Sequence, residues 1–129
     1  MGKQKLPRPT DGELEILHVL WERGPSTVRD VHEKLTRSRE VGYTTVLKLL
    51  QIMIDKGLVA RDESQRSHVY RARYKQEQTQ RQLVSDLLSR AFGGSAEKLV
   101  MQALRTRKVS ADQLAEIRKL LDDLERKQP

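Results

Sequence analysis

The hydrophobic pattern of this chain changes period once, and that change restricts the folds open to it. Over residues 10–57, apolar side chains recur at three- and four-residue steps, which is the spacing of amphipathic helices. Over residues 67–74 the pattern becomes a strict alternation, in which Tyr70 and Tyr74 share one side of a strand. Helical spacing then returns and continues almost to the end of the chain. The sequence therefore predicts a mainly α fold with one small β-hairpin.

The first two predicted helices have recognisable starts. The first begins at Thr10, with Glu13 at the position of a capping box, and Gly24-Pro25 ends it. The second begins at Ser26 or Thr27, either of which can cap it. The residues expected to face inward from these helices are Leu14, Leu17, Leu20, Trp21, Val28, Val31 and Leu35. Each helix is therefore expected to bury one face.

A third predicted helix begins after Gly42 and ends at Lys56-Gly57. Its apolar residues follow the pattern of a buried face: Val46, Leu49, Leu50, Met53 and Ile54. Its opposite face carries Thr44, Thr45, Lys48 and Gln51. Short hydroxyl side chains let a helix approach the DNA major groove closely, so this face is suited to base contacts. Taken alone, it also fits an ordinary solvated face.

Two β-prone segments follow the third helix, residues 58–62 and 67–74, with a polar tip between them. Arg66 and Ser67 lie at this tip. Three helices followed by a hairpin is the order of a winged helix-turn-helix. In that arrangement the third helix reads a groove and the wing touches flanking phosphates. The ordered set predicts this fold more strongly than any single element does.

The charge of the chain favours a polyanionic partner. Lys and Arg number 25 against 18 Asp and Glu, which gives a formal net charge of +7 and a pI near 9.9. Residues 1–75 hold 15 basic and 10 acidic residues, a net of +5, and residues 76–129 hold 10 and 8, a net of +2. Clustered basic residues are typical of nucleic-acid binding, although the same balance fits a soluble basic protein.

Several classes of protein are disfavoured by what the sequence lacks. Zero cysteines exclude a disulfide framework, a zinc finger and a cysteine nucleophile. His18, His32 and His68 have no metal-ligand spacing and are expected on polar surfaces or helix faces. No catalytic residue, metal site or cofactor is therefore expected, and an enzyme is disfavoured. Without an apolar run of about 20 residues or a signal peptide, we expect a cytoplasmic protein with no membrane insertion.

Four segments resemble the penicillinase-repressor (BlaI/MecI/CopY) family of bacterial transcription factors. They are Leu14–Trp21, Thr27–His32, Gly42–Leu47 and Lys56–Val59, and the segment Arg66–Tyr70 fits as well. The similarity extends over roughly residues 8–125, and its most specific part is Tyr43-Thr44-Thr45-Val46 followed by Lys56-Gly57-Leu58-Val59.

This resemblance implies a homodimeric repressor whose winged helix binds an inverted repeat in double-stranded DNA. Carried over position by position, it implies the DNA-binding residues Ser26, Thr27, Arg29, Gly42, Tyr43, Thr44, Thr45, Lys48, Arg66 and Ser67. Tyr43 has two open roles, reaching a phosphate through its hydroxyl or packing under the start of the helix. A two-fold dimer matches the geometry of palindromic DNA.

The C-terminal half is predicted to be three short amphipathic helices, and about 50 residues of this kind cannot enclose a core alone. We therefore expect a DNA-binding domain over residues 1–75 and a helical dimerisation domain over residues 76–129. The residues expected to form the dimer interface are Leu83, Leu87, Leu88, Leu99, Leu114, Ile117, Leu120, Leu121 and Leu124. Packing of these stripes back on the first half is the alternative.

The chain also departs from the resembled family. Members tied to β-lactam sensing are cleaved at an Asn-Phe bond, yet this chain contains no asparagine and has Gln102-Ala103 at the corresponding place. A membrane-bound sensor metalloprotease of different specificity is an open alternative as a partner. The copper-responsive branch is excluded by the lack of cysteine. Two other functions are kept as alternatives: a ligand-sensing winged-helix regulator, and a winged helix that docks on another protein.

Overall fold

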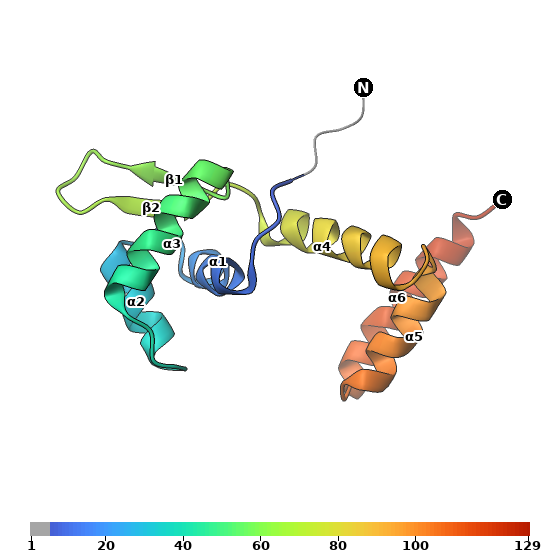
Figure 1. Ribbon diagram of the computed structural model, residues 1–129. Helices are drawn as coiled ribbons and strands as arrows, with labels where there is room; N and C mark the ends of the chain where they lie inside the picture. The colour runs from blue at the N-terminus through green and yellow to red at the C-terminus, as the bar shows by residue number, and fades with distance from the viewer. Residues whose placement is uncertain (1–5) are drawn as a thin grey trace, which may run out of the picture. The chain divides into compact units, whose positions relative to one another are not determined.

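The computed structural model describes residues 6–129, and Figure 1 shows its elements in chain order. These are α1 (Asp11–Arg23), α2 (Val28–Thr36), α3 (Tyr43–Lys56), β1 (Val59–Asp62), β2 (Val69–Ala72), α4 (Gln76–Ala91), α5 (Ala96–Thr106) and α6 (Ala111–Arg126). The predicted mainly α fold with a single hairpin is confirmed.

The helix starts form as the sequence predicts. Thr10 and Glu13 make a reciprocal capping box at α1, and Thr27 makes one with Asp30 at α2, so Thr27 rather than Ser26 is the cap. Gly57 ends α3 in the left-handed conformation, with φ of 80°. A side chain at Gly57 would be strained by this φ and would also lie 3.3 Å from Nη1 of Arg73.

The core lies between α1, α2, α3 and the base of the hairpin. Its buried apolar residues are Ile16, Leu17, Val19, Leu20, Val28, Val31, Leu35, Val46, Leu50, Met53, Leu58, Val59 and Tyr70. Tyr70 brings an aromatic ring from β2 into this cluster, so the hairpin is part of the core and not an appendage. Leu14 and Trp21, which were expected to face inward, are only partly buried at its edge.

The hairpin has a third backbone partner that the sequence did not predict. Strands β1 and β2 pair antiparallel from Val59 opposite Ala72 to Asp62 opposite Val69. On the other side of β2, the Ser26 amide donates to the Tyr70 carbonyl at 2.9 Å, and the Tyr70 amide donates to the Ser26 carbonyl at 2.8 Å. The segment before α2 therefore joins the wing, which we define as β1, β2 and residues 63–68 between them.

A buried ion pair connects α1 to the end of α3. The Lys56 ammonium lies 2.6 Å from Oε1 of Glu13, whose side chain is 3% exposed, and the Thr10 amide donates to the same oxygen at 2.9 Å. Burial opposes ionisation of Glu13. The hydrogen bonds from Lys56 and Thr10 and the charge of Lys56 outweigh it, so the pKa of Glu13 lies below its usual value.

The chain forms two compact units, one through Ser85 and one from Asp86 to Pro129. The division therefore falls inside α4, ten residues beyond the boundary expected after Lys75. Two features of the first unit account for the later boundary. Thr79 of α4 is buried, and the Trp21 indole donates to the carbonyl of Tyr74, just before α4, at 3.0 Å. The first turns of α4 thus belong with the winged helix.

The second unit contains no fully buried residue. Ser110 and Gln113 form the predicted capping box of α6, and Ser95 caps α5. The residues expected at a dimer interface divide into two groups by burial. The partly buried group is Leu83, Leu88, Leu99, Leu114 and Ile117. The exposed group is Leu87, Leu120, Leu121 and Leu124. Within the described chain, no helix is long and apolar enough to cross a membrane.

Candidate nucleic-acid interface

The third helix presents the polar face that the sequence predicts. Val46, Leu50 and Met53 are buried on one side, and the opposite side exposes a set that we call the reading face. The reading face consists of Thr44, Thr45, Lys48 and Gln51. The only acidic residue of α3, Asp55, lies in its last turn, away from the N-terminal end. The helix is therefore suited to approach an anion with its N-terminal half.

The start of α3 is open to an anion because no side chain caps it. Gly42 occupies the N-cap with an extended backbone. Because glycine has no side chain, no side-chain hydrogen bond caps the first turn. Amide groups at an uncapped helix start attract anions through their free N–H donors and the helix dipole. Gly42 thus has a structural reason for its place among the predicted residues.

A groove of about 390 Å³ lies between the start of α2, the start of α3 and the wing. Its lining residues are Thr27, Val28, Arg29, Tyr43, Leu47, Arg66, Ser67, His68 and Tyr70. The structure therefore brings together five predicted residues from three separated segments: Thr27, Arg29, Tyr43, Arg66 and Ser67. The remaining predicted residues of α3 lie on its reading face.

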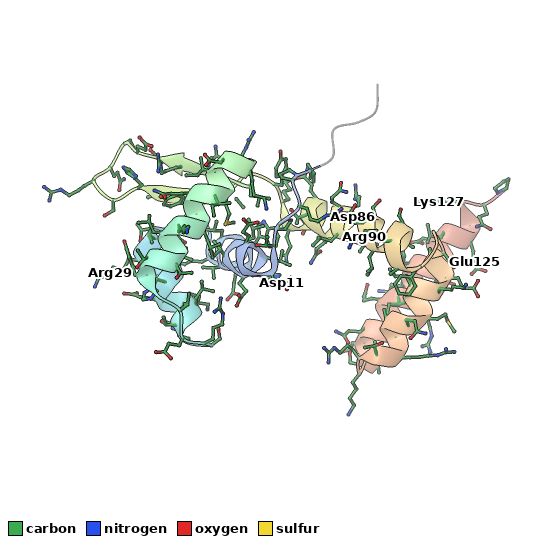
Figure 2. All side chains as sticks on the ribbon, viewed as in Figure 1. Asp11, Arg29, Asp86, Arg90, Glu125 and Lys127 are labelled. Atoms are coloured by element: carbon green, nitrogen blue, oxygen red, sulfur yellow. The ribbon has the colours of Figure 1, made fainter. Side chains whose placement is uncertain are left out.

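The two arginines of the groove are available to a polyanion. Arg29 forms an ion pair with Glu33 at 3.3 Å, and this pair is weak because both side chains are mostly exposed. Figure 2 shows Arg29 on the outer side of α2. Arg66 is exposed and, within the described residues, has no acidic partner. The acidic residues of the wing are already engaged, since Glu63 pairs with Arg61 and Asp62 accepts from the Ser64 amide.

Ser26 is the predicted DNA-binding residue that the structure does not place at this surface. Its side chain is 1% exposed, and its hydroxyl donates to the Gly24 carbonyl at 2.8 Å. Its backbone is taken up by the pairing with Tyr70. The expectation that its side chain faces a phosphate is therefore wrong for this conformation, because that expectation treated the loop before α2 as free.

His32, expected on a polar surface or a helix face, lies on α2 and contacts the turn that leads into α3. Its Nε2 lies 2.8 Å from the Val41 carbonyl, and its ring meets the ring of Tyr43 edge-on at 5.7 Å between centroids. Tyr43 is nevertheless 49% exposed and lines the groove. Both roles considered for Tyr43 are thus compatible: its ring packs on His32, and its hydroxyl has no partner within the described residues.

Leu47, His68 and the base of Tyr70 also line the groove and were not predicted as site residues. Their position results from the meeting of three elements, which local periodicity does not encode. The only sequence signal was the position of His68 directly after Arg66 and Ser67. Among the described residues, no group of three or more His, Cys, Asp or Glu side chains could hold a metal ion.

Three helices, a hairpin packed on the third of them, and a basic groove between wing and helix starts define a winged helix-turn-helix protein. Comparison with known sequences gives the particular family. The penicillinase repressor family matches residues 9–123, and the chain belongs to this family.

Individual relatives agree with this assignment. The chain is 34% identical over 122 residues to the transcriptional regulator BlaI of Mycobacterium tuberculosis, with 94% of this chain and 88% of the relative covered. It is 18% identical over 115 residues to the penicillinase repressor of Staphylococcus aureus, which covers 89% and 91% of the two chains. These relatives are regulators by name, in agreement with the expectation that the chain is not an enzyme.

Two solved structures share the fold. The DNA-binding domain of the repressor BlaI matches with a TM-score of 0.51 and 24% identity, over 59% of this chain and 93% of that chain. A chain of the hsRosR-S4 complex matches with a TM-score of 0.53 and 19% identity, over 89% and 88%. The predicted winged helix-turn-helix is confirmed.

Proposed function

We propose that this protein is a homodimeric transcriptional repressor that binds an inverted-repeat operator and so occludes a promoter. The observation that carries the proposal is the single basic surface formed by the groove and the reading face of α3. Family membership supports repression as the outcome of binding. Binding requires neither catalysis nor a cofactor.

In this proposal the groove holds the DNA backbone. Arg29 and Arg66 stand on two sides of it, from α2 and from the wing, while Thr27, Tyr43 and Ser67 supply hydroxyl groups between them. Phosphate oxygens accept hydrogen bonds from both kinds of donor. The Thr27 oxygen accepts from the Asp30 amide, which leaves its hydroxyl proton free to donate. Such contacts fix the position of α3 on the duplex.

The reading face of α3 then lies in the major groove. Lys48 can donate to guanine O6 and N7 and to a nearby phosphate, and Gln51 can pair with adenine N6 and N7. Thr44 and Thr45 lie in the first turn, next to the uncapped helix start at Gly42. Their short side chains allow this end of the helix to come close to base edges and phosphates.

The second unit is proposed to form the dimer. Leu87, Leu120, Leu121 and Leu124 are exposed in the single chain, and each lies between 48% and 57% exposed. Soluble monomers rarely expose large contiguous apolar patches, and three of these leucines lie close together on α6. A second copy would cover them and create the two-fold axis that an inverted repeat requires. The dimerisation function is thus assigned to α4, α5 and α6.

Release by the cleavage of the resembled family is not part of this proposal. The chain has no asparagine, and the Gln102–Ala103 bond lies in the middle of α5. The Thr106 hydroxyl also donates to the Gln102 carbonyl at 2.6 Å. A sensor metalloprotease acting here would need local opening of α5, because proteolytic nicking favours exposed loops.

The proposal predicts the salt dependence of binding. Arg66→Ala and Lys48→Ala should each weaken binding and lower the slope of log K against log salt by about 0.9, because one phosphate contact releases about that many counterions. The measurement is fluorescence anisotropy with fragments of the protein's own upstream region at several salt concentrations. Arg107→Ala, in the exposed loop between α5 and α6, is the matched control.

Two results would contradict this docking. Unchanged slopes for both Arg66→Ala and Lys48→Ala would remove the groove and α3 from the interface. A lack of specific retention of any upstream fragment at low salt would instead favour a winged helix that docks on another protein.

Thr45→Ala should change the preferred sequence more than the overall affinity. Thr45 is exposed on the reading face, and base contacts discriminate between sequences while phosphate contacts strengthen all of them. Selection from a random duplex pool with the two proteins would measure this. Identical selected sequences with reduced affinity would assign Thr45 to the backbone.

A further inference from the structure

One apolar residue of α3 does not belong to the core. Val46, Leu50 and Met53 are buried, and Leu47, Leu49 and Ile54 pack against the same cluster. Ile52 is 39% exposed and is not part of that packing. Ile52 thus leaves apolar surface on the polar side of α3, where it is available to a partner outside the chain.

The position of Ile52 on the helix identifies where that partner lies. At 100° per residue, Ile52 follows Thr45 by seven residues and Lys48 by four, so the three share one edge of the reading face. Their side chains are exposed along this edge. The surface that contains Ile52 is thus the surface proposed to enter the major groove, and its contact there is with base edges.

The chemistry of the major groove offers one apolar group to such a side chain. Thymine carries a 5-methyl group at its base edge, while the other bases present hydrogen-bond donors and acceptors there. We propose that Ile52 is a specificity-determining residue that packs on the 5-methyl group of a thymine in each operator half-site. The inference rests on the proposed function and adds a base preference to it.

The spacing along α3 places this thymine relative to the bases at the helix start. Seven residues rise about 10 Å along a helix, which is about three base-pair steps of 3.4 Å. The thymine contacted by Ile52 therefore lies within about three base pairs of the base contacted near Thr45, since three is the separation for a helix axis parallel to the duplex axis. Thr45 also carries a methyl group, so the two residues must be tested separately.

The test removes the methyl group alone. The full-length protein is first used to select a binding sequence from a random duplex pool, and each thymine of the selected half-site is then replaced singly by uracil. At one position the wild-type protein should lose affinity about fourfold, since burial of one methyl-sized group contributes about 0.8 kcal/mol. Ile52→Ala should bind the thymine and uracil duplexes equally at that position.

Thr45→Ser is the matched control, because it removes a methyl group from the same edge and keeps the hydroxyl. This variant should retain the wild-type response to uracil at the position assigned to Ile52. If Thr45→Ser abolishes that response and Ile52→Ala keeps it, the assignment to Ile52 is overturned. Specific binding with no uracil effect at any position also overturns it while the repressor function stands. Failure to select any sequence overturns both.

Discussion

Leu121→Glu is expected to convert the proposed dimer into monomers at micromolar concentration. Leu121 is 51% exposed in the single chain, so the substitution leaves the folded monomer intact. The two-fold symmetry of the proposed dimer places the change in the interface twice. Because about half of the Leu121 side chain is already buried in the single chain, each copy loses about half of the roughly 1.5–3 kcal/mol that full burial of a leucine contributes. The dissociation constant of the dimer should therefore rise at least about tenfold. Buried glutamates add a further penalty.

Sedimentation velocity across a concentration series measures this change directly. Ala115→Glu is the matched control, because Ala115 is exposed and lies about 120° around α6 from Leu121. Leu121→Glu should also lose most of its affinity for an inverted repeat, while its affinity for a single half-site stays close to that of the wild type. A dimer that persists in Leu121→Glu would show that the exposed leucines of α6 lie outside the interface.

Lys56→Met is expected to lower the free energy of unfolding of the winged-helix unit by about 3 kcal/mol. Removal of one partner from a buried ion pair leaves an uncompensated charge, which costs about 3–5 kcal/mol when both groups are fully buried. Lys56 is 32% exposed, so we expect the lower end of this range. Glu13→Gln should cost less, because the amide oxygen can still accept from Thr10. Denaturant unfolding at neutral pH gives the comparison.

The pH dependence of the free energy of unfolding tests whether the buried Glu13 carboxylate causes the loss of stability in Lys56→Met. In the wild type the pKa of Glu13 is lowered from 4.5, so its stabilisation is complete above pH 4.5 and is lost as pH falls through the folded-state pKa. Without Lys56, burial should raise the pKa of Glu13 above that value, so protonation relieves the penalty. The stability difference between wild type and Lys56→Met should therefore shrink below pH 4.5. A difference independent of pH would assign the loss to packing alone.

The sequence predicts what depends on neighbours along the chain. Capping boxes at Thr10 and Ser110 form as expected because cap and partner are three residues apart. The end of α3 at Gly57 was predicted for the same reason, because the signal is local. The order of elements, and with it the winged-helix fold, follows from these local signals together.

Contacts between distant residues escaped prediction. Glu13 and Lys56 are 43 positions apart, and each looked like an ordinary helix-terminal charge. Ser26 looked like a free hydroxyl because nothing in its neighbourhood indicates that Tyr70 occupies its backbone. Five residues of the groove were predicted one by one from the resemblance, but the groove itself and its other lining residues required the fold.

The pairing of Ser26 with Tyr70 has a consequence for how the wing meets DNA. An isolated two-stranded hairpin is only marginally stable in water. Here β2 has a backbone partner on each side, and Tyr70 is anchored in the core. The strands on either side of Arg66 and Ser67 are thus ordered before any encounter with DNA. Because these strands lose their conformational entropy during folding, binding to DNA does not have to order them, and this preorganisation increases the affinity.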